Sequence, residues 1–186
     1  EILTLSQDID SGTFEYKGNN VVQTLTMTDF GTTDYYNLLI NDTNTNKATF
    51  AIGASNTMTV AGAMTVTSGT YSGNARPMTV TGITTVNGGT YTASTGVQTL
   101  NGGLTISGGT FTHSTGTVDI NGPVTLTSGT LTLSSGLFTV SGNWTRTATT
   151  FTPGTGRVTF DSAGTQELNA GGANFNKITC AGTGEV

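Results

Sequence analysis

The sequence predicts an all-β chain folded as a parallel β-solenoid, or β-helix, with about 20 residues per coil, which we expect to be right-handed. Residues 60–159 consist of five consecutive 20-residue copies with no insertion or deletion between them, and a fixed internal period is typical of repeat architectures. Within a copy, apolar and polar residues alternate, as in Met64, Thr65, Val66 and Thr67. A period of two indicates strands rather than helices.

Stacking the copies turns each repeat position into a column. Three columns are apolar, although the third ends at Arg146: Val60, Val80, Leu100, Ile120, Val140 and Phe160; Tyr71, Tyr91, Phe111, Leu131 and Phe151; Val66, Val86, Ile106 and Leu126. Another column carries hydroxyl groups: Thr65, Thr85, Thr105, Thr125 and Thr145. Two glycine columns predict sharp corners, where a positive φ is needed: Gly69, Gly89, Gly109 and Gly129; Gly96, Gly116, Gly136 and Gly156. Two or three short strands per coil fit this pattern.

A single copy cannot fold alone, because about five buried apolar side chains do not offset the conformational entropy of ordering 20 residues. Stability has to come from stacking, in which each strand bonds to the coils above and below at ~4.8 Å. We therefore expect one continuous solenoid over the whole 186 residues. Its parts are irregular N-terminal coils or a cap (1–59), five regular coils (60–159) and a C-terminal coil (160–186).

The C-terminal segment keeps the strand-like alternation but loses the 20-residue phase. It also echoes the beginning of the chain, since Thr13-Phe14-Glu15 resembles Thr159-Phe160-Asp161 and Leu25 resembles Leu168. We interpret residues 160–186 as the start of a second, longer repeat of roughly 140 to 146 residues. No cap is evident at the end, so we expect it to fray or to be covered by another copy.

Composition excludes several classes of protein. Charged residues make up 9% of the chain, hydrophobic residues make up 34%, and the net charge is −5. Because the apolar residues fall in register, the chain is not a disordered low-complexity segment. Six scattered Lys and Arg residues give no basic patch for nucleic acid, and no apolar run is long enough for membrane insertion. Cys180 is the only cysteine, which excludes a disulfide framework.

Catalytic and metal sites have weak support. Asp119 and Asp161 lie near each other in the repeat but skip one coil, and His113 has no recognisable nucleophile, so we predict no catalytic residues and no cofactor. Asp42, Asn44 and Asn46 form a D-x-N-x-N run that partly resembles a calcium loop, but the expected glycine and bidentate acid are missing. A polar turn is the favoured interpretation. The similar cluster around Asp8 and Asp10 is equally weak.

Two threonine columns flank an apolar column and predict a two-wide hydroxyl array. Spacings of ~4.8 Å between coils and ~6.7 Å along a strand follow from strand geometry. The array resembles the ice-binding face of threonine-rich β-solenoid antifreeze proteins, although threonine also suits any solvent-facing strand. Its members are Thr70, Thr90, Thr110, Thr130 and Thr150 in one column and Thr92, Thr112, Thr132 and Thr152 in the other.

Longer phrases such as NGGLTISGGTFT, SGTLTLSSGLFTVSGNWT and FTPGTGRVTFDSAGTQEL resemble the tandem repeats of very large secreted or surface proteins of bacteria. This resemblance implies an extracellular, adhesin-like or fibrous β-solenoid without enzymatic activity. We therefore expect a non-catalytic stalk or filament subunit at the cell surface that associates with itself, head to tail, or with further repeats of the same chain. An ice-binding solenoid, a glycan-binding adhesin segment and a degenerate polysaccharide-active β-helix remain as alternatives.

Overall fold

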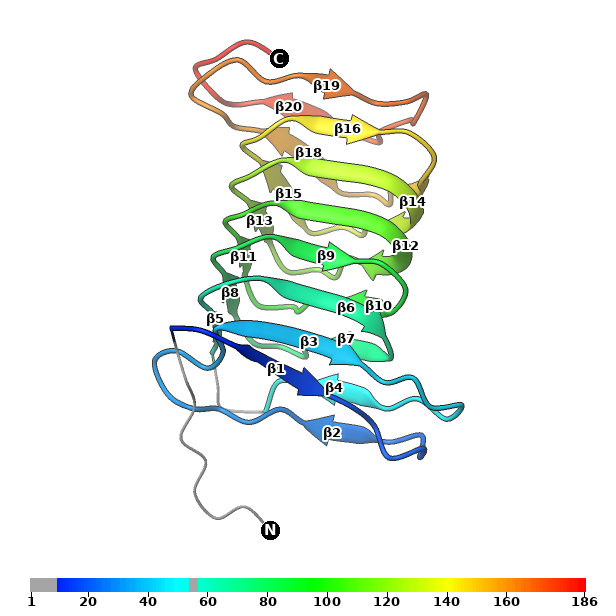
Figure 1. The fold of residues 1–186 in the computed structure, drawn as a ribbon. Coiled ribbons are helices and arrows are strands. Elements are labelled where there is room, and N and C mark those ends of the chain that lie inside the picture. The colour runs from blue at the N-terminus through cyan, green and yellow to red at the C-terminus, as the bar shows by residue number, and fades with distance from the viewer. Residues whose placement is uncertain (1–9, 54–56) are drawn as a thin grey trace.

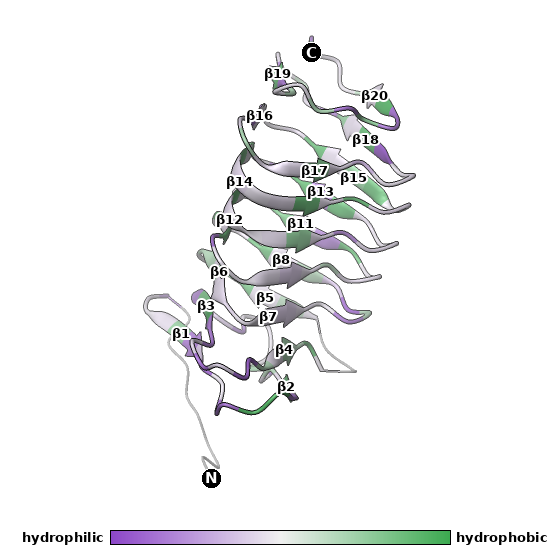
Figure 2. Ribbon diagram, turned by 90° about the vertical axis from the view of Figure 1, so that its right-hand side faces the viewer, coloured by the Kyte–Doolittle hydropathy of each residue, from purple (hydrophilic) through white to green (hydrophobic). Residues whose placement is uncertain are grey.

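The computed structural model describes residues 10–53 and 57–186. They form a parallel β-solenoid of about eight turns with roughly 20 residues per coil, as the sequence predicts. No helix occurs among these residues. The coil is right-handed. From β1 toward β20, near-side strands such as β6 and β9 point to the right in Figure 1 and the chain returns behind them, and the view in Figure 2 agrees.

Each regular coil contains three short strands, which build three sides of the rod. The first side is a seven-stranded sheet made of β5 (Met58–Val60), β8 (Met78–Val80), β11 (Gln98–Leu100), β13 (Val118–Ile120), β15 (Leu137–Val140), β18 (Arg157–Phe160) and β20 (Ile178–Cys180). The second side consists of β1 (Thr13–Tyr16), β3 (Asn37–Asn41), β6 (Met64–Ser68), β9 (Thr84–Val86), the first parts of β12 (Leu104–Thr112) and β14 (Val124–Thr132), β16 (Trp144–Arg146) and β19 (Leu168–Asn169). The third side consists of β2 (Thr24–Thr26), β4 (Thr49–Ala51), β7 (Thr70–Ser72), β10 (Thr90–Thr92), the second parts of β12 and β14, and β17 (Thr150–Thr152).

The pairing register follows the sequence repeat on the first side, where Val60 lies opposite Val80 and the 20-residue step continues to Phe160 opposite Cys180. The early coils are longer, since Thr13 lies opposite Asn37 and Leu38 opposite Met64. In the last coil, Trp144 pairs with Leu168, 24 residues on. The extra residues precede β19, and the following stretch to β20 is correspondingly short, so the first side keeps its phase.

The predicted apolar columns point inward and form one core. On the third side, Tyr71, Tyr91 and Phe111 are fully buried, and their rings stack along the axis with centroids 4.6 Å apart at each step. Alternation between inward apolar and outward polar residues explains this, because successive strand side chains point to opposite faces. Arg146, which ends the third predicted column, instead donates through its side chain to the carbonyl oxygens of Thr149 and Gly171.

The glycine columns serve close stacking more than unusual backbone angles. We expected a positive φ at all of them, but in the first column only Gly69 (φ 84°) and Gly129 (φ 79°) have one. At Gly89, a Cβ atom would lie 2.7 Å from the carbonyl oxygen of Gly69, and at Gly116 it would lie 2.6 Å from that of Gly96. Such distances are too short for a side chain, so these glycines allow the backbones of adjacent coils to approach at the corners.

An aromatic cluster and two carboxylates organise the first coils. Phe14, Tyr16, Phe30 and Tyr35 lie with ring centroids 5.0–6.1 Å apart. The buried Asp34 accepts hydrogen bonds from the amides of Phe30 and Thr59.

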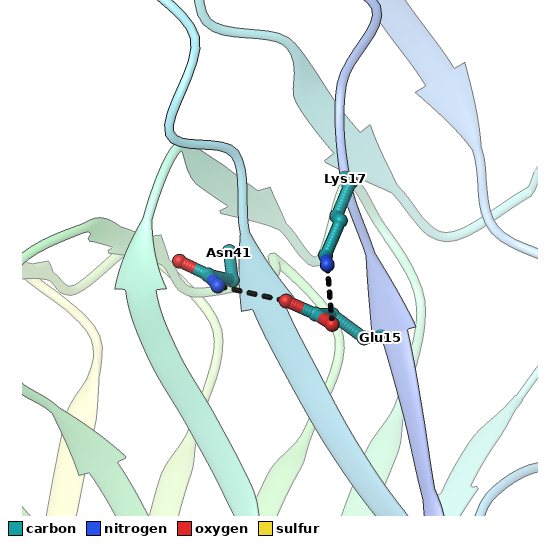
Figure 3. A network of polar contacts seen from close by, with 3 residues as sticks. All are labelled: Glu15, Lys17 and Asn41. Atoms are coloured by element: carbon teal, nitrogen blue, oxygen red, sulfur yellow. Dashed lines mark hydrogen bonds and ion pairs between the residues drawn. The ribbon is translucent and has the colours of Figure 1, made fainter.

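Glu15 joins β1 to β3 on the outer surface (Figure 3). It accepts a hydrogen bond from the Asn41 side chain at 2.7 Å and pairs with Lys17 at 3.1 Å. The Asn41 hydrogen bond, with help from Lys17, lowers the pKa of Glu15 below its usual value.

The C-terminal segment does not repeat the structural positions that its sequence echoes. Phe14 lies in β1 on the second side, whereas Phe160 lies in β18 on the first side. Leu25 lies on the third side, whereas Leu168 lies on the second. Each echoed segment is therefore displaced by one side. Between β19 and β20 the chain brings Phe175 against the rings of Trp144 and Phe151.

Candidate functional site

The predicted threonine array lies on the third side, which faces the viewer in Figure 2. Thr70, Thr90, Thr110, Thr130 and Thr150 are directly paired from coil to coil, as are Ser72, Thr92, Thr112, Thr132 and Thr152. Their apolar neighbours in the same strands form the inward column. Both threonine columns therefore point outward, one on each side of a buried aromatic or aliphatic residue.

The first threonine column is longer than the sequence repeat suggests. Thr24 pairs with Thr49, and Thr49 pairs with Thr70, so seven threonines follow one another without interruption. The second column gains Thr26 but is interrupted by Ala51. Sequence reasoning missed these members because the early coils are not 20 residues long. The T-x-T pattern of Thr24-Leu25-Thr26 was the available signal.

Hydroxyl groups on the third side are free within the chain. None of the nine predicted threonines makes a side-chain hydrogen bond to another described residue, and no strand of this side contains a charged residue. The other sides differ. On the first side, Thr139 donates to Asp119 at 2.6 Å and Ser141 donates to Asp161 at 2.7 Å. The third side therefore presents a neutral, regular array of hydroxyl groups that remain available to an external partner.

Asp119 and Asp161 are not arranged as a catalytic pair. They lie two coils apart, about 10 Å along the axis at ~4.8 Å per coil, and in neighbouring columns rather than the same one. Each carboxylate also accepts a hydrogen bond from a hydroxyl group of the next coil. Paired carboxylates of glycosidases are closer than this, at about 5–9.5 Å.

His113 lies in the core rather than at a surface site. Its ring packs edge-on against Phe138, with centroids 5.6 Å apart, and Nε2 lies 2.9 Å from the carbonyl oxygen of Gly116. Its Nδ1 atom is buried without a partner. Burial lowers the pKa of His113 below its usual value, so at neutral pH the ring is uncharged.

Asp42, Asn44 and Asn46 form a hydrogen-bonded turn. The buried Asp42 carboxylate accepts from the amides of Asn44 and Ala48 at 3.1 and 2.7 Å, and from the Asn44 side chain at 2.6 Å. Asn46 contributes its backbone amide to Asn20 instead. The Ala48 amide is the main reason that the pKa of Asp42 is lowered. Because N–H donors occupy the carboxylate oxygens, this geometry fits the polar turn that the sequence favours over a calcium loop.

Two searches of the described residues returned nothing. They contain no group of three or more His, Cys, Asp or Glu side chains that could hold a metal ion. They also contain no helix that could span a lipid bilayer. Of the weaker sequence candidates, Asp8 lies outside the described residues.

Comparison with known proteins gives no identification. No family model matches the sequence, no curated protein matches it, and no solved structure matches the fold. The functional argument therefore depends on the arrangement of this chain's own residues.

Proposed function

We propose that this chain is a non-catalytic structural segment of an extracellular bacterial fibre, either a stalk or a filament. The observation that carries the proposal is the uninterrupted 20-residue register on the first side, from Val60 to Cys180. A solenoid stacked this regularly extends in one direction by simple addition of coils. Length and stiffness are the properties that a stalk requires.

The surface chemistry supports the same role. The outward columns consist mainly of threonine, and the few carboxylates on the first side are bonded to neighbouring hydroxyl groups. Backbone groups in the strands bond to the adjacent coils, which leaves little extended chain for a protease to bind. The resemblance to tandem repeats of bacterial surface proteins adds the extracellular location and the adhesin-like class.

Immunogold electron microscopy of intact cells that produce the protein tests the location. We expect gold particles along extended structures outside the cell envelope, and a protease-resistant rod after mild digestion of the cell surface. Label confined to the cell interior would overturn the proposal.

Ice binding is a second candidate, and the free hydroxyl groups of the third side favour it. A flat lattice partner requires regularly spaced polar groups that the protein does not use itself, and seven successive threonines provide them. We expect a variant with Thr110→Tyr and Thr130→Tyr to lose inhibition of ice recrystallisation. The matched control, Thr105→Tyr with Thr125→Tyr on the second side, should retain it. Wild-type protein without any inhibition would exclude this candidate.

A glycan-binding adhesin segment would use the same surface. The two variants then serve on a glycan array, where loss of a reproducible signal only in the third-side variant would support glycan binding there.

A further inference from the structure

Both ends of the solenoid leave core columns uncovered. On the second side the inward column runs from Phe14 to Leu168, and every member between them is at most 1% exposed. On the third side the column runs from Leu25 to Phe151, again with fully buried members between. The four terminal residues are only partly buried. Each end therefore presents apolar side chains of a kind that the interior covers with another coil.

The strand edges at these ends are also unprotected. Within the described residues, β1 and β2 pair only with later strands, and β17, β19 and β20 pair only with earlier ones. Natural edge strands are usually blunted by lysine, proline or a bulge. Four of these five strands contain no charged residue and no proline: Thr24–Thr26, Thr150–Thr152, Leu168–Asn169 and Ile178–Cys180. Such edges are open to pairing with another chain.

The direction of winding matches one end to the other. Every regular coil passes from the first side to the second and then to the third, as β8, β9 and β10 do. The last described strand, β20, lies on the first side, and the first described strand, β1, lies on the second. The two ends lie at opposite poles of the rod (Figure 1). A second copy stacked on the C-terminal end would therefore continue the winding without skipping a side.

We propose that the C-terminal end binds the N-terminal coil of a second copy of this chain, with β19 pairing in parallel with the partner copy's β1. The inference rests on the proposed structural function and names the residues of the contact. Leu168 packs against Phe14 in the shared second-side column, and Leu25 covers Phe151 and Phe175 on the third side. This register places Asn169 opposite Glu15, so no like charges meet. Because the two surfaces differ, the contact is heterologous and builds an open filament.

End-blocking variants test this contact by sedimentation velocity and electron microscopy over a range of concentrations. Leu168→Arg blocks the C-terminal end and Leu25→Arg blocks the N-terminal end, each at a partly exposed position. Wild type should form filaments, each variant alone should remain a single rod, and an equimolar mixture of the two should stop at pairs. Thr112→Arg adds the same charge in the middle of the third side and should still assemble.

Cys180 provides a readout that does not depend on filament length. It is exposed at the end of the first-side core column, so a stacked copy should cover it. Alkylation of wild type should slow by about tenfold or more at assembling concentrations, because a covered thiol is shielded from the reagent. Alkylation of Leu168→Arg, checked for wild-type circular dichroism, should not slow.

Two outcomes would overturn the end-to-end contact. One is wild type that remains a single rod with constant Cys180 reactivity at every concentration. The other is assembly that Thr112→Arg abolishes and Leu168→Arg leaves intact, which would indicate lateral association. Either outcome is separate from the proposed function, which immunogold labelling of intact cells tests without reference to assembly.

Discussion

Replacing Phe111 with alanine should reveal how much of the stability comes from stacking between coils. Phe111 is fully buried in β12, pairs with Tyr91 on one side and Leu131 on the other, and lies almost parallel to the Tyr91 ring, at 9° and 4.6 Å. Truncation removes the ring from both neighbouring contacts and leaves a cavity that rigid coils cannot close. A buried Phe→Ala change of this kind costs about 3–5 kcal/mol.

The same column supplies the matched control. Phe151 is its terminal member and is only partly buried, with Phe175 over it. Phe151→Ala should therefore cost about 1–2 kcal/mol, since partial burial forfeits part of the ~3 kcal/mol gained by a buried Phe. Urea unfolding followed by circular dichroism, at concentrations where the chain is a single rod, measures both variants. Equal costs for the two variants would refute the argument that the C-terminal coil is uncovered.

Three further changes test individual interior groups by the same urea unfolding. Thr84→Val should stabilise the protein by about 1 kcal/mol, because the Thr84 hydroxyl is buried without a partner in an apolar column; destabilisation would show that the hydroxyl has a role. Asp34→Ala should cost about 2 kcal/mol or more, because the amides of Phe30 and Thr59 lose a buried acceptor, and limited proteolysis should then cut the first coil earliest. His113→Leu should remove a loss of stability at acid pH. Burial lowers the pKa of His113, so as the pH falls below about 6.5 the unfolded chain takes up the proton first and gains relative stability. Wild type and His113→Leu with the same pH dependence between 7 and 5 would contradict this assignment.

The repeat predicted the regular coils because a single period determines both strand pairing and burial. Once Val60 and Val80 share a column, the partner of every residue in β5 to β18 follows by counting. Counting fails where the coil length changes. Thr24 and Thr49 joined the threonine ladder through offsets of 25 and 21 residues, and the echo between Phe14 and Phe160 proved to lie on different sides.

The free or occupied state of each hydroxyl group could not be predicted from the columns. Thr139 and Thr159 occupy the same outward column, yet only Thr139 faces an acceptor in the preceding coil, because Asp119 replaces the usual threonine there. Such a difference depends on one substitution and one side-chain rotamer. Sequence reasoning identified the array on the third side, and the hydrogen bonds on the other two sides distinguished it from them.

Periodicity itself explains why the ends, rather than the sides, should determine how copies associate. A neutral threonine side looks the same after a shift of one coil, about 4.8 Å, so lateral contacts between two rods have several registers of nearly equal energy. Flat strands without a distinguishing pattern are known to be weakly specified in register. The ends lack this degeneracy, because Leu168 with Phe175 and Phe14 with Leu25 occur once each per chain. A contact between them has one register, and a filament built from it has one axial repeat.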